Sequence, residues 1–552
     1  MKNIRSLVEN SMLWAAYGDA LGFITELAEE ESGVKWRSGQ NKIQTTISWR
    51  RKLGGLFGVT AKFPAGTYSD DTQLRLATIR AINSNGMFDV EAFAKIELPL
   101  WNCYALGAGR GTKDAAFNLT KKNVRWNSNF YKGAKGGRSY IDSGGNGAAM
   151  RIQPHVWAGM GQNSFSEIAR DVVRNTITTH GHPHGIIGAV FHALCLYKIL
   201  DQGYIPEPTL WANLAIDAGK YTLQAILNDS DLSTVWLSQW NNNSTKSFEE
   251  VHNSTALEIH SMADSIGIYT DKHKSYEKLV EEFDANNPEI RGMASLTSIF
   301  SLAVAFIYNS GNKNVLTEVV NCLGTDTDTI ATMAGALIGA LPNEKQPSAL
   351  QDHLLLIEEA NKLTNISEGR ETRKFQYPSL LTWQPPTKAS DVVRKIEDIF
   401  LLPGLGEINI GEKIGESNDT SWFWATLSFG QSIIIKISSP IPELKNSESF
   451  PFKPYMSQMK SRELYKENQP QLPLMERDST LTIKNIKFEK LDANRAFDLA
   501  KKSNFEAEAI GNLLIELTKL DTYTLETVSA FSVLVSKAII ERTKKRYRLE
   551  GQ

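Results

Sequence analysis

The chain has 552 residues, of which 41% are hydrophobic and 22% are charged, and its formal net charge at pH 7 is −2. This length favours two or three domains with a large core, and the composition is that of an ordinary globular protein. The small net charge excludes a protein that binds nucleic acid through an overall basic field.

The first segment, MLWAAYGDALGFI, faintly resembles a signal peptide, but Asp19 interrupts its apolar run. The most apolar stretch, residues 295–308, is shorter than the roughly 20 residues that span a bilayer, and we interpret it as a buried core helix. The three cysteines are far apart and form no Cys-x-x-Cys pair, which indicates reduced thiols. We therefore expect a cytoplasmic protein without a membrane segment.

Residues 1 to about 380 are predicted to form helices joined by glycine-rich loops. Apolar residues recur at helical spacing in DTQLRLATIRAI, FSEIARDVVRNTI and GIIGAVFHALCLYKIL, and again in MASLTSIFSLAVAFIY and TIATMAGALIGAL. Small residues in these segments let neighbouring helices approach closely. Glycine-rich loops lie at 105–111, 133–137 and 143–147. We predict a compact all-α domain whose functional residues lie on loops.

Two adjacent aspartates, Asp70 and Asp71, open one of these helices in the stretch YSDDTQL. Ser69 can cap the helix, and acids in the first turn complement the positive end of the helix dipole. That interpretation needs no metal ion. The alternative is a site for divalent cations, and this motif alone does not decide between the two.

A second acidic motif, GTDTDTIATMAGAL at 324–337, again puts aspartates before a helix of small residues. Asp326 and Asp328 are two residues apart, so in an extended or turn backbone their side chains leave on the same side. The two motifs together supply the oxygen donors that Mg²⁺ or Mn²⁺ prefers, whereas zinc favours His and Cys. Two ions about 3.5–4 Å apart could share such carboxylates. Two unrelated capped helices remain the alternative.

The character of the sequence changes near residue 377, where Pro378, Pro385 and Pro386 suit a connection between domains. Beyond it, WFWATLSF and SIIIKIS predict strands, and NFEAEAIGNLLIELTKL and LETVSAFSVLVSKAIIERTKKRYRLE predict helices. We therefore divide the chain into residues 1–385 and an accessory α+β domain of residues 386–552. The basic run ERTKKRYRLE is interpreted as a solvated helix end rather than a contact with nucleic acid.

Four stretches, in this order, resemble the motifs of the ADP-ribosylglycohydrolase family, which includes the dinitrogenase reductase-activating glycohydrolases and the ADP-ribosyl-acceptor hydrolases. GDALGFITE resembles the N-terminal G-D-A-x-G…E motif, and YSDDTQL resembles [ST]-D-D-T. SGGNGAAMRIQP, followed by ITTH, resembles the G-x-G-N-G-x-x-M-R segment and T-H. GTDTDTIATMAGALIGAL resembles G-G-D-T-D-T-I-A-x-x-A-G-A. The resemblance covers roughly residues 8 to 345.

This resemblance implies an all-α orthogonal helical fold with two Mg²⁺ or Mn²⁺ ions at its centre. Glu26 matches a mobile glutamate that touches a metal or its water. The implied metal ligands are Ser69, Asp70, Asp71, Asp326, Asp328 and Thr329. The segment implied to hold the diphosphate and the distal ribose is Gly144, Gly145, Asn146 and Gly147, and His180 would line the ligand cleft. Independently, glycines let backbone N–H groups approach a phosphate closely.

Several neighbouring residues keep open assignments. Arg151 is equally consistent with a compensating charge for phosphate and with an internal salt bridge. The loop at 107–118 is a weaker expectation for the border of the cleft. The histidines at 180, 182 and 184 favour a loop with one functional histidine over a transition-metal site. Candidates for stacking on adenine are Phe130, Tyr131, Tyr140 and Trp157.

One departure from the family pattern concerns the backbone before the second acidic motif. Thr325 replaces the second glycine that often precedes D-T-D-T. A β-branched residue disfavours positive φ, so the backbone there is expected to differ. Ser69 replaces the commoner threonine of the first motif but keeps the oxygen. Neither change removes an implied ligand.

The reaction implied by the resemblance is hydrolysis of the bond between C1″ of ADP-ribose and an acceptor. Cations would orient the distal ribose through its 2″ and 3″ hydroxyls and activate water. Glu26 is the favoured proton acceptor, with Asp70, Asp71 and Asp326 as the other catalytic candidates. The expected partner is ADP-ribose or an ADP-ribosylated macromolecule.

Two other functions stay open. One is a protein that binds ADP-ribose or occludes a toxin's active site, with weak or no catalysis. The other is a metal-dependent hydrolase of a free ADP-ribosyl metabolite. Residues 386–552 are expected to serve some protein partner, and nucleic acid is expected only as a modified substrate. No residue selects the acceptor.

Overall fold

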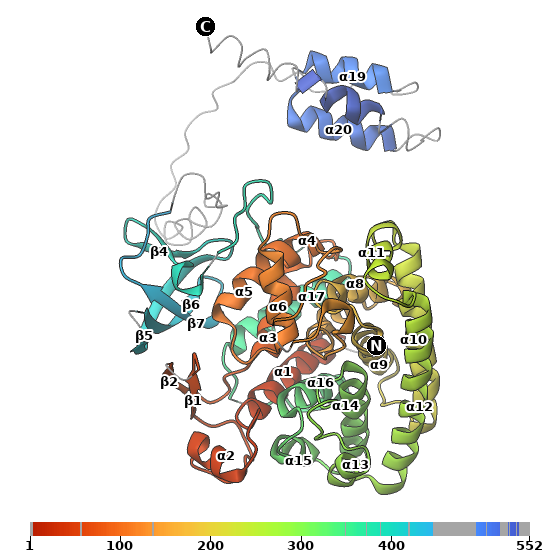
Figure 1. Cartoon of the computed structure of the whole chain (residues 1–552), viewed down its shortest axis with the longest axis vertical. Helices are drawn as coiled ribbons and strands as arrows, with labels where there is room; N and C mark the ends of the chain where they lie inside the picture. Colours follow the sequence, from red (N-terminus) through yellow and green to blue (C-terminus); the bar gives the residue numbers. More distant parts are fainter. Residues whose placement is uncertain are drawn as a thin grey trace, which may run out of the picture. The chain divides into compact units, whose positions relative to one another are not determined.

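The computed structural model contains two compact units, Met1–Ser461 and Arg462–Gln552 (Figure 1). The residues that it describes are 4–55, 58–134, 137–347, 349–370, 372–386, 388–417, 420–444, 493–503, 505–518, 528, 530–536 and 538–539. Each unit has its own hydrophobic core.

The first unit is mostly helical, as the sequence predicts. Its helices are α1 Ile4–Gly22, α2 Glu31–Ser38, α3 Asp70–Ala81, α4 Val90–Ala92, α5 Leu98–Tyr104, α6 Arg110–Leu119, α7 Gln153–Gly159, α8 Phe165–Ile177, α9 Pro183–Gln202, α10 Trp211–Asn228, α11 Leu237–Asn242, α12 Phe248–His273, α13 Tyr276–Glu282, α14 Ala294–Asn309, α15 Val315–Asn321, α16 Thr327–Gly339 and α17 His353–Ser367.

Helices α1 and α16 pack closely together because glycines lie at their contact. A Cβ on Gly18 would lie 2.1 Å from the carbonyl oxygen of Ala331, closer than any real side chain approaches. At the end of α1, a Cβ on Gly22 would lie 2.4 Å from the Cα of Asp328. This packing brings the loop that follows α1 to the beginning of α16, where the second acidic motif lies.

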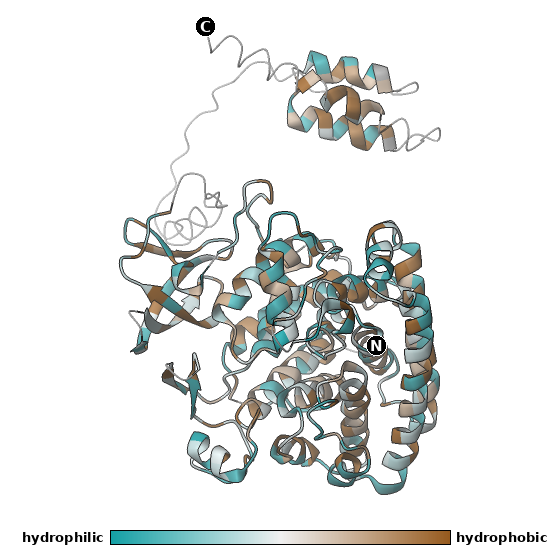
Figure 2. Ribbon diagram, viewed as in Figure 1, coloured by the Kyte–Doolittle hydropathy of each residue, from teal (hydrophilic) through white to brown (hydrophobic). Residues whose placement is uncertain are grey.

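The apolar stretch at 295–308 is a core helix, as predicted. It lies within α14, in which every residue from Ala294 to Tyr308 is buried, and Figure 2 shows its hydrophobic character. Helix α9 is also long and apolar enough to cross a bilayer by length and composition. However, 83% of that window is buried inside the protein, as in the core helix of a folded domain.

A β-hairpin interrupts the region that the sequence analysis predicts as all-α. Strands β1 (Trp49–Leu53) and β2 (Val59–Phe63) pair antiparallel, with Trp49 opposite Phe63. Each strand has only five residues, and β1 carries three consecutive basic residues, so the alternation of apolar residues is short. The hairpin therefore has a weak sequence signal.

A five-stranded antiparallel sheet follows the helices, in the order β3-β4-β5-β6-β7. The predicted strands are confirmed as β6 (Thr420–Leu427) and β7 (Ser432–Ser438). Three further strands are not predicted from the sequence: β3 (Arg394–Ile396), β4 (Ile399–Leu402) and the long β5 (Gly406–Ser417). The register of β5 against β6 shifts twice between Ile410 and Gly415, which disrupts the alternation that marks a strand.

The sheet belongs to the same compact unit as the helices. A buried ion pair joins Arg80 of α3 to Glu97, with 2.8 Å between Nη2 and Oε2. Arg80 Nη1 also donates to Gln431 Oε1, just before β7, and the Tyr377 hydroxyl donates to Glu97 Oε1. The change in composition near residue 385 therefore marks a change of secondary structure inside one unit. The division at 385/386 does not coincide with the boundary between units, and a separate accessory role for 386–552 stays a prediction.

The described part of the second unit is helical. It contains α19 (Ala493–Lys502) and α20 (Ala507–Thr518), and residues 530–536 are also helical. Its small core consists of Ala496, Ala500, Leu513, Leu517, Phe531 and Val535. The predicted helix at 504–520 corresponds to α20, and the basic run at 541–550 lies outside the described residues.

Candidate active site

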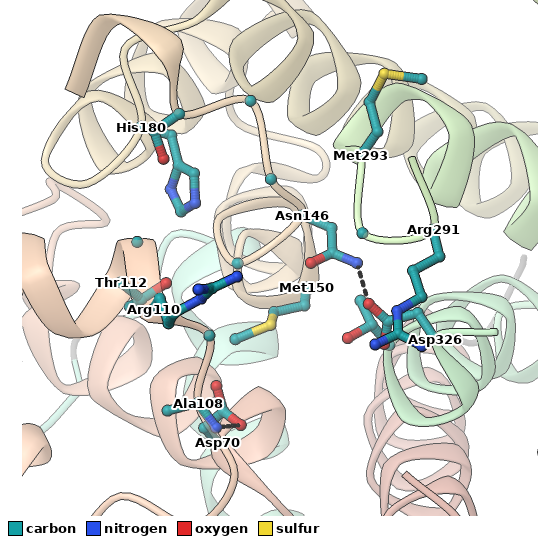
Figure 3. A pocket seen from close by; sticks show the side chains of 18 of the residues that line it. Asp70, Ala108, Arg110, Thr112, Asn146, Met150, His180, Arg291, Met293 and Asp326 are labelled. Atoms are coloured by element: carbon teal, nitrogen blue, oxygen red, sulfur yellow. Dashed lines mark hydrogen bonds between the residues drawn. The ribbon is translucent and has the colours of Figure 1, made fainter. Parts of the chain in front are cut away.

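A cavity of about 650 Å³ opens between several loops of the first unit (Figure 3). Its volume is typical of a small-molecule site. The residues predicted from the sequence that line it are Glu26, Asp70, Asp71, Gly144, Gly145, Asn146, Gly147, His180, Asp326, Asp328 and Thr329. The fold therefore brings both acidic motifs, the N-terminal glutamate and the glycine segment to one place.

Asp70 and Asp71 lie at the beginning of α3, where Ser69 caps the helix. The Ser69 hydroxyl accepts from the backbone N–H of Asp71 at 3.3 Å and donates to Asp71 Oδ2 at 3.0 Å. The backbone N–H of Ala108 donates to Asp70 Oδ1 at 2.7 Å, as Figure 3 shows. Ser69 is fully buried and is not among the residues that line the cavity. Its helix-capping function is thus observed, and its function as a metal ligand stays a prediction.

Asp19 fixes this turn from behind. Its Oδ1 accepts from the backbone N–H of Ser69 at 2.8 Å, and its Oδ2 accepts from both the N–H and the hydroxyl of Thr72, at 2.9 and 2.5 Å. Asp19 is fully buried and lies in the GDALG motif. Asp19 is not among the site residues predicted from the sequence. The sequence feature that could have identified Asp19 is the position of an aspartate within a helix of small residues.

The second acidic motif surrounds the beginning of α16. Asp326 precedes the helix, and its Oδ2 accepts from the Asn146 amide at 2.8 Å (Figure 3). Asp328 Oδ1 accepts from the N–H of Thr329 at 2.9 Å. The positive φ falls on Gly324, at +90°, and Thr325 has none. The threonine is therefore tolerated without strain.

Burial and mutual repulsion raise the pKa values of three aspartates at the cavity, Asp70, Asp71 and Asp328. Burial, reinforced by the nearby Glu26 charge, raises the pKa of Asp70 to about 8. The pKa of Asp71 is raised well above its usual value by burial and by the charges of Asp19 and Asp70. The pKa of Asp328 is raised similarly, by burial and by Glu26 and Asp71. Protons, or a cation in their place, are therefore needed to neutralise this cluster.

The donor set fits a hard divalent cation chemically, because the acids supply the carboxylate oxygens that Mg²⁺ and Mn²⁺ prefer. Asp71 Oδ1 is buried and has no hydrogen-bond partner among the described residues. A cation would satisfy such an orphaned acceptor. In the described ranges, no group of three or more His, Cys, Asp or Glu side chains forms a ready-made metal site. The acids share one cavity without being gathered into a coordination shell, and the ligand set stays a prediction.

Glu26 lies on the loop after α1, at the cavity wall. Its Oε2 pairs with Arg51 Nη1 of β1 at 2.6 Å, and both side chains are mostly buried. Arg37 Nη1 donates to the carbonyl oxygens of Ile24 and Glu26, at 3.0 and 2.7 Å. Neither arginine is among the site residues predicted from the sequence.

The glycine segment is tied to its surroundings by Asn146 and Arg151. The Asn146 amide bridges Asp326 and the Thr297 hydroxyl. Arg151 is fully buried and donates to the carbonyl oxygens of Gly147 and Asn175, at 2.7 and 3.1 Å. Among the described residues Arg151 forms no salt bridge, and it is not one of the residues that line the cavity, so a contact with phosphate stays a prediction. Instead, Arg151 donates hydrogen bonds to uncharged carbonyl oxygens, and the bond to Gly147 holds the backbone of the glycine segment in place.

His180 lines the cavity with a neutral ring. Burial and the nearby Arg151 lower the pKa of His180 to about 3, and its Nδ1 lies 2.7 Å from the Thr179 hydroxyl. The other two histidines of the series have separate contacts. His182 caps α9 by accepting from the N–H of His184, and His184 Nδ1 lies 2.8 Å from the Ser295 hydroxyl. These contacts favour one cavity histidine over a three-histidine site.

The four predicted stacking aromatics do not line the cavity. Tyr131, Tyr140 and Trp157 are buried, and their polar ends bond to Thr179, Ile177 and Ser11, respectively. They were singled out by closeness in sequence, which does not determine side-chain direction. The residues at the cavity wall that could face a base or phosphate are Arg110, Arg138, Arg291 and Met293. The predicted loop at 107–118 is a loop only up to Gly109, because helix α6 begins at Arg110. The segment does border the cavity, through residues 108–112 and Asp114.

The match of the sequence to a family model agrees with the motifs. A family model described as ADP-ribosylglycohydrolase matches residues 1–368. The chain is 24% identical over 371 residues to "Putative ADP-ribosyl glycohydrolase L543" of Acanthamoeba polyphaga mimivirus, covering 66% of this chain and 96% of that protein. A solved structure titled "ADP-ribosylglycohydrolase-related protein complex" aligns with a TM-score of 0.41 and 17% identity, over 66% of this chain and 100% of that chain. The matched family region ends before strand β3.

Proposed function

Because this chain belongs to the ADP-ribosylglycohydrolase family, we propose that it hydrolyses the bond between ADP-ribose and a modified acceptor. The observation that carries the proposal is the convergence of Glu26, both aspartate pairs and the glycine segment on one cavity. Structural capping of two unrelated helices would not require these segments to meet. The acceptor can be a protein side chain or another macromolecule.

The residues that would hold two divalent cations are Asp70, Asp71, Asp326, Asp328 and Thr329, with Ser69 behind them and Glu26 at the edge. Bound Mg²⁺ or Mn²⁺ would supply positive charge near the distal ribose and lower the pKa of water. Asn146 holds Asp326 in place, and Asp19 holds the turn that carries Asp70 and Asp71.

Residues of the chain itself would bind the substrate and transfer the proton. The backbone of residues 144–147 and the arginines at the cavity wall would bind the diphosphate. Glu26 would take a proton from the attacking water as the bond between C1″ and the acceptor breaks and a new bond to the water oxygen forms. The departing acceptor would then take up that proton from Glu26, which returns to its carboxylate form. His180 is neutral and would offer a hydrogen bond to the sugar without adding charge.

The test is a panel of arginine-, serine- and nucleic-acid-linked ADP-ribose substrates, assayed with Mg²⁺, with Mn²⁺ and with a chelator. We expect release of ADP-ribose from at least one substrate, and loss of at least roughly 100-fold in kcat for Asp328→Ala. Asp217→Ala, at an exposed acid of α10, is the matched control. Cleavage that persists in the chelator or in Asp328→Ala would contradict the metal-dependent reaction.

A further inference from the structure

We propose that Arg51 is the positioning residue for Glu26, and that the five-stranded sheet beyond the family region holds Arg51 in place through the β1–β2 hairpin. The proposal rests on the proposed function insofar as Glu26 is the proton acceptor. It adds a function for strands that the family match does not include. It also predicts that this sheet is needed for turnover.

The first step is that Glu26 needs an external support. After α1 the backbone continues as hydrogen-bonded turns, in which the N–H of Glu26 donates to the Gly22 carbonyl oxygen at 2.9 Å, but these bonds do not hold the Glu26 side chain. Leu27, directly after Glu26, adopts φ +58° and is exposed. A non-glycine residue in this region is strained, and such strain persists only when the surroundings determine it. Arg37 holds the loop backbone at the Ile24 and Glu26 carbonyl oxygens. Arg51 is the residue that holds the carboxylate itself.

The second step is that Arg51 is itself rigidly placed. Its guanidinium lies 4.9 Å from the centroid of the Phe23 ring, in the cation–π range. Phe23 packs against Trp49 and Phe63 of the hairpin, at centroid distances of 5.0 and 5.9 Å. The inward face of the hairpin is thus one aromatic cluster that orients Arg51 toward the cavity loop.

The third step is that the hairpin packs against the sheet. An isolated two-stranded hairpin is only marginally stable in water. Here β2 packs beside β5, and Figure 1 shows the hairpin next to that strand. The Trp424 ring of β6 meets Phe63 edge-on at 5.9 Å, and its indole N–H donates to the Lys62 carbonyl oxygen at 3.3 Å. A chain of contacts therefore connects Trp424, Phe63, Phe23, Arg51 and Glu26.

A purely structural ion pair is the competing explanation, and three variants of the full chain separate the two. Arg51→Ala removes the contact with Glu26. Arg51→Lys keeps the charge but lacks the planar fork of arginine, so it should recover only part of the effect. Arg50→Ala is the matched control. Arg50 directly precedes Arg51 in β1 and contacts Trp36 on the outer surface rather than Glu26.

We expect Arg51→Ala to lower kcat about tenfold, with KM changed less than about twofold, because binding is kept while the reacting group is misplaced. Arg51→Lys should lie between Arg51→Ala and the unmodified chain, and Arg50→Ala should match the unmodified chain. In a Glu26→Gln background, Arg51→Ala should have no further effect on kcat. Equal kcat losses from Arg50→Ala and Arg51→Ala, or an unchanged effect of Arg51→Ala in that background, would overturn the proposal.

Amide hydrogen exchange tests the same chain of contacts without any substrate, so its outcome is independent of the proposed reaction. Arg51→Ala should raise exchange of residues 24–30 about tenfold, and Trp424→Ala should raise exchange of residues 24–30 and 49–63. Trp383→Ala is the control, since that indole also donates to a backbone carbonyl oxygen, at Lys95, away from the hairpin. Unchanged exchange of residues 24–30 in Arg51→Ala refutes the positioning by Arg51. Unchanged exchange in Trp424→Ala refutes support by the sheet.

Discussion

At the scale of single residues, Asp19 is the side chain on which the first acidic motif depends. Its two oxygens accept three hydrogen bonds from Ser69 and Thr72. Asp19→Asn keeps the size but turns an N–H₂ group toward a donor, so one buried bond is lost and two donors face each other. We expect a loss of about 2 kcal/mol in the free energy of unfolding, measured by denaturant titration.

The same variant should lose activity, because the turn that carries Asp70 and Asp71 relaxes. Asp217→Asn, at an exposed position of α10, controls for the change of charge. If Asp19→Asn unfolds at the same denaturant concentration as the unmodified chain, the three hydrogen bonds do not hold this turn.

The raised pKa of Asp70 predicts that a divalent cation stabilises the fold more at high pH than at low pH. Asp70 has a pKa of about 8 in the metal-free fold and about 3.8 when unfolded, so the fold retains a proton that the unfolded chain releases. The stability from this group is complete below about pH 3.8 and is lost as pH rises toward 8. Metal-free protein should therefore be less stable at pH 8 than at pH 6 with respect to this group.

A divalent cation replaces that proton, so the rise in Tm on adding Mn²⁺ should be larger at pH 8 than at pH 6. At each pH, the difference between the Tm with Mn²⁺ and the Tm with a chelator removes the contribution of titrating groups far from the cavity, such as the buried His155. Asp328→Asn should abolish most of the rise. An equal rise at both pH values would mean that cation binding displaces no proton here.

The acids themselves could be predicted from the sequence, because each of the two acidic motifs lies directly at the beginning of a helical pattern. The contacts that Arg51 and Arg151 form could not be predicted. Arg51 reaches Glu26 only through the pairing of a hairpin, and Arg151 points to the carbonyl oxygens of Gly147 and Asn175 rather than to a charge. Side-chain direction depends on backbone geometry that spacing alone does not determine.

At the scale of elements, the loop before α6 must come very close to the acids. Gly107 has φ +89°, and a Cβ there would lie 2.6 Å from Asp70 Oδ1. Gly107→Ala should therefore destabilise the fold by about 1–2 kcal/mol and lower kcat at least about tenfold. Gly109→Ala is the matched control, since a Cβ there meets nothing within 4 Å. Similar unfolding midpoints and rates for the two variants would exclude this steric argument.

The helices were the predictable elements, because periods of three to four residues recur over many turns in α9, α14 and α16. The strands were partly predictable. β6 and β7 are rich in aromatic and β-branched residues, whereas β5 has the sequence GEINIGEKIGES, with glycines and charges at its bulges. Local composition reveals a strand only when its register is regular.

At the scale of the whole molecule, the predicted boundary at residue 385 shows what amino-acid composition alone does not predict about domain organisation. Prolines and a change from helix to strand mark a change of element, but they do not show which core an element joins. Leu402 and Ile433 pack in the same core as the helices, and Asp352 bridges the Tyr68 hydroxyl and Ser432 at the beginning of β7. The sheet is therefore linked through Asp352 to Tyr68, the residue directly before Ser69.

Two truncated chains test this organisation. A chain of residues 1–461 retains the whole first unit, so its Tm and kcat should stay close to those of the full chain. A chain of residues 1–385 exposes the surface under the sheet, leaves Arg80 without Gln431 and removes the support of Phe63. Its Tm should fall by roughly 10 °C or more, because several kcal/mol of burial are lost. Equal Tm and kcat for both chains would instead make the sheet a separable domain.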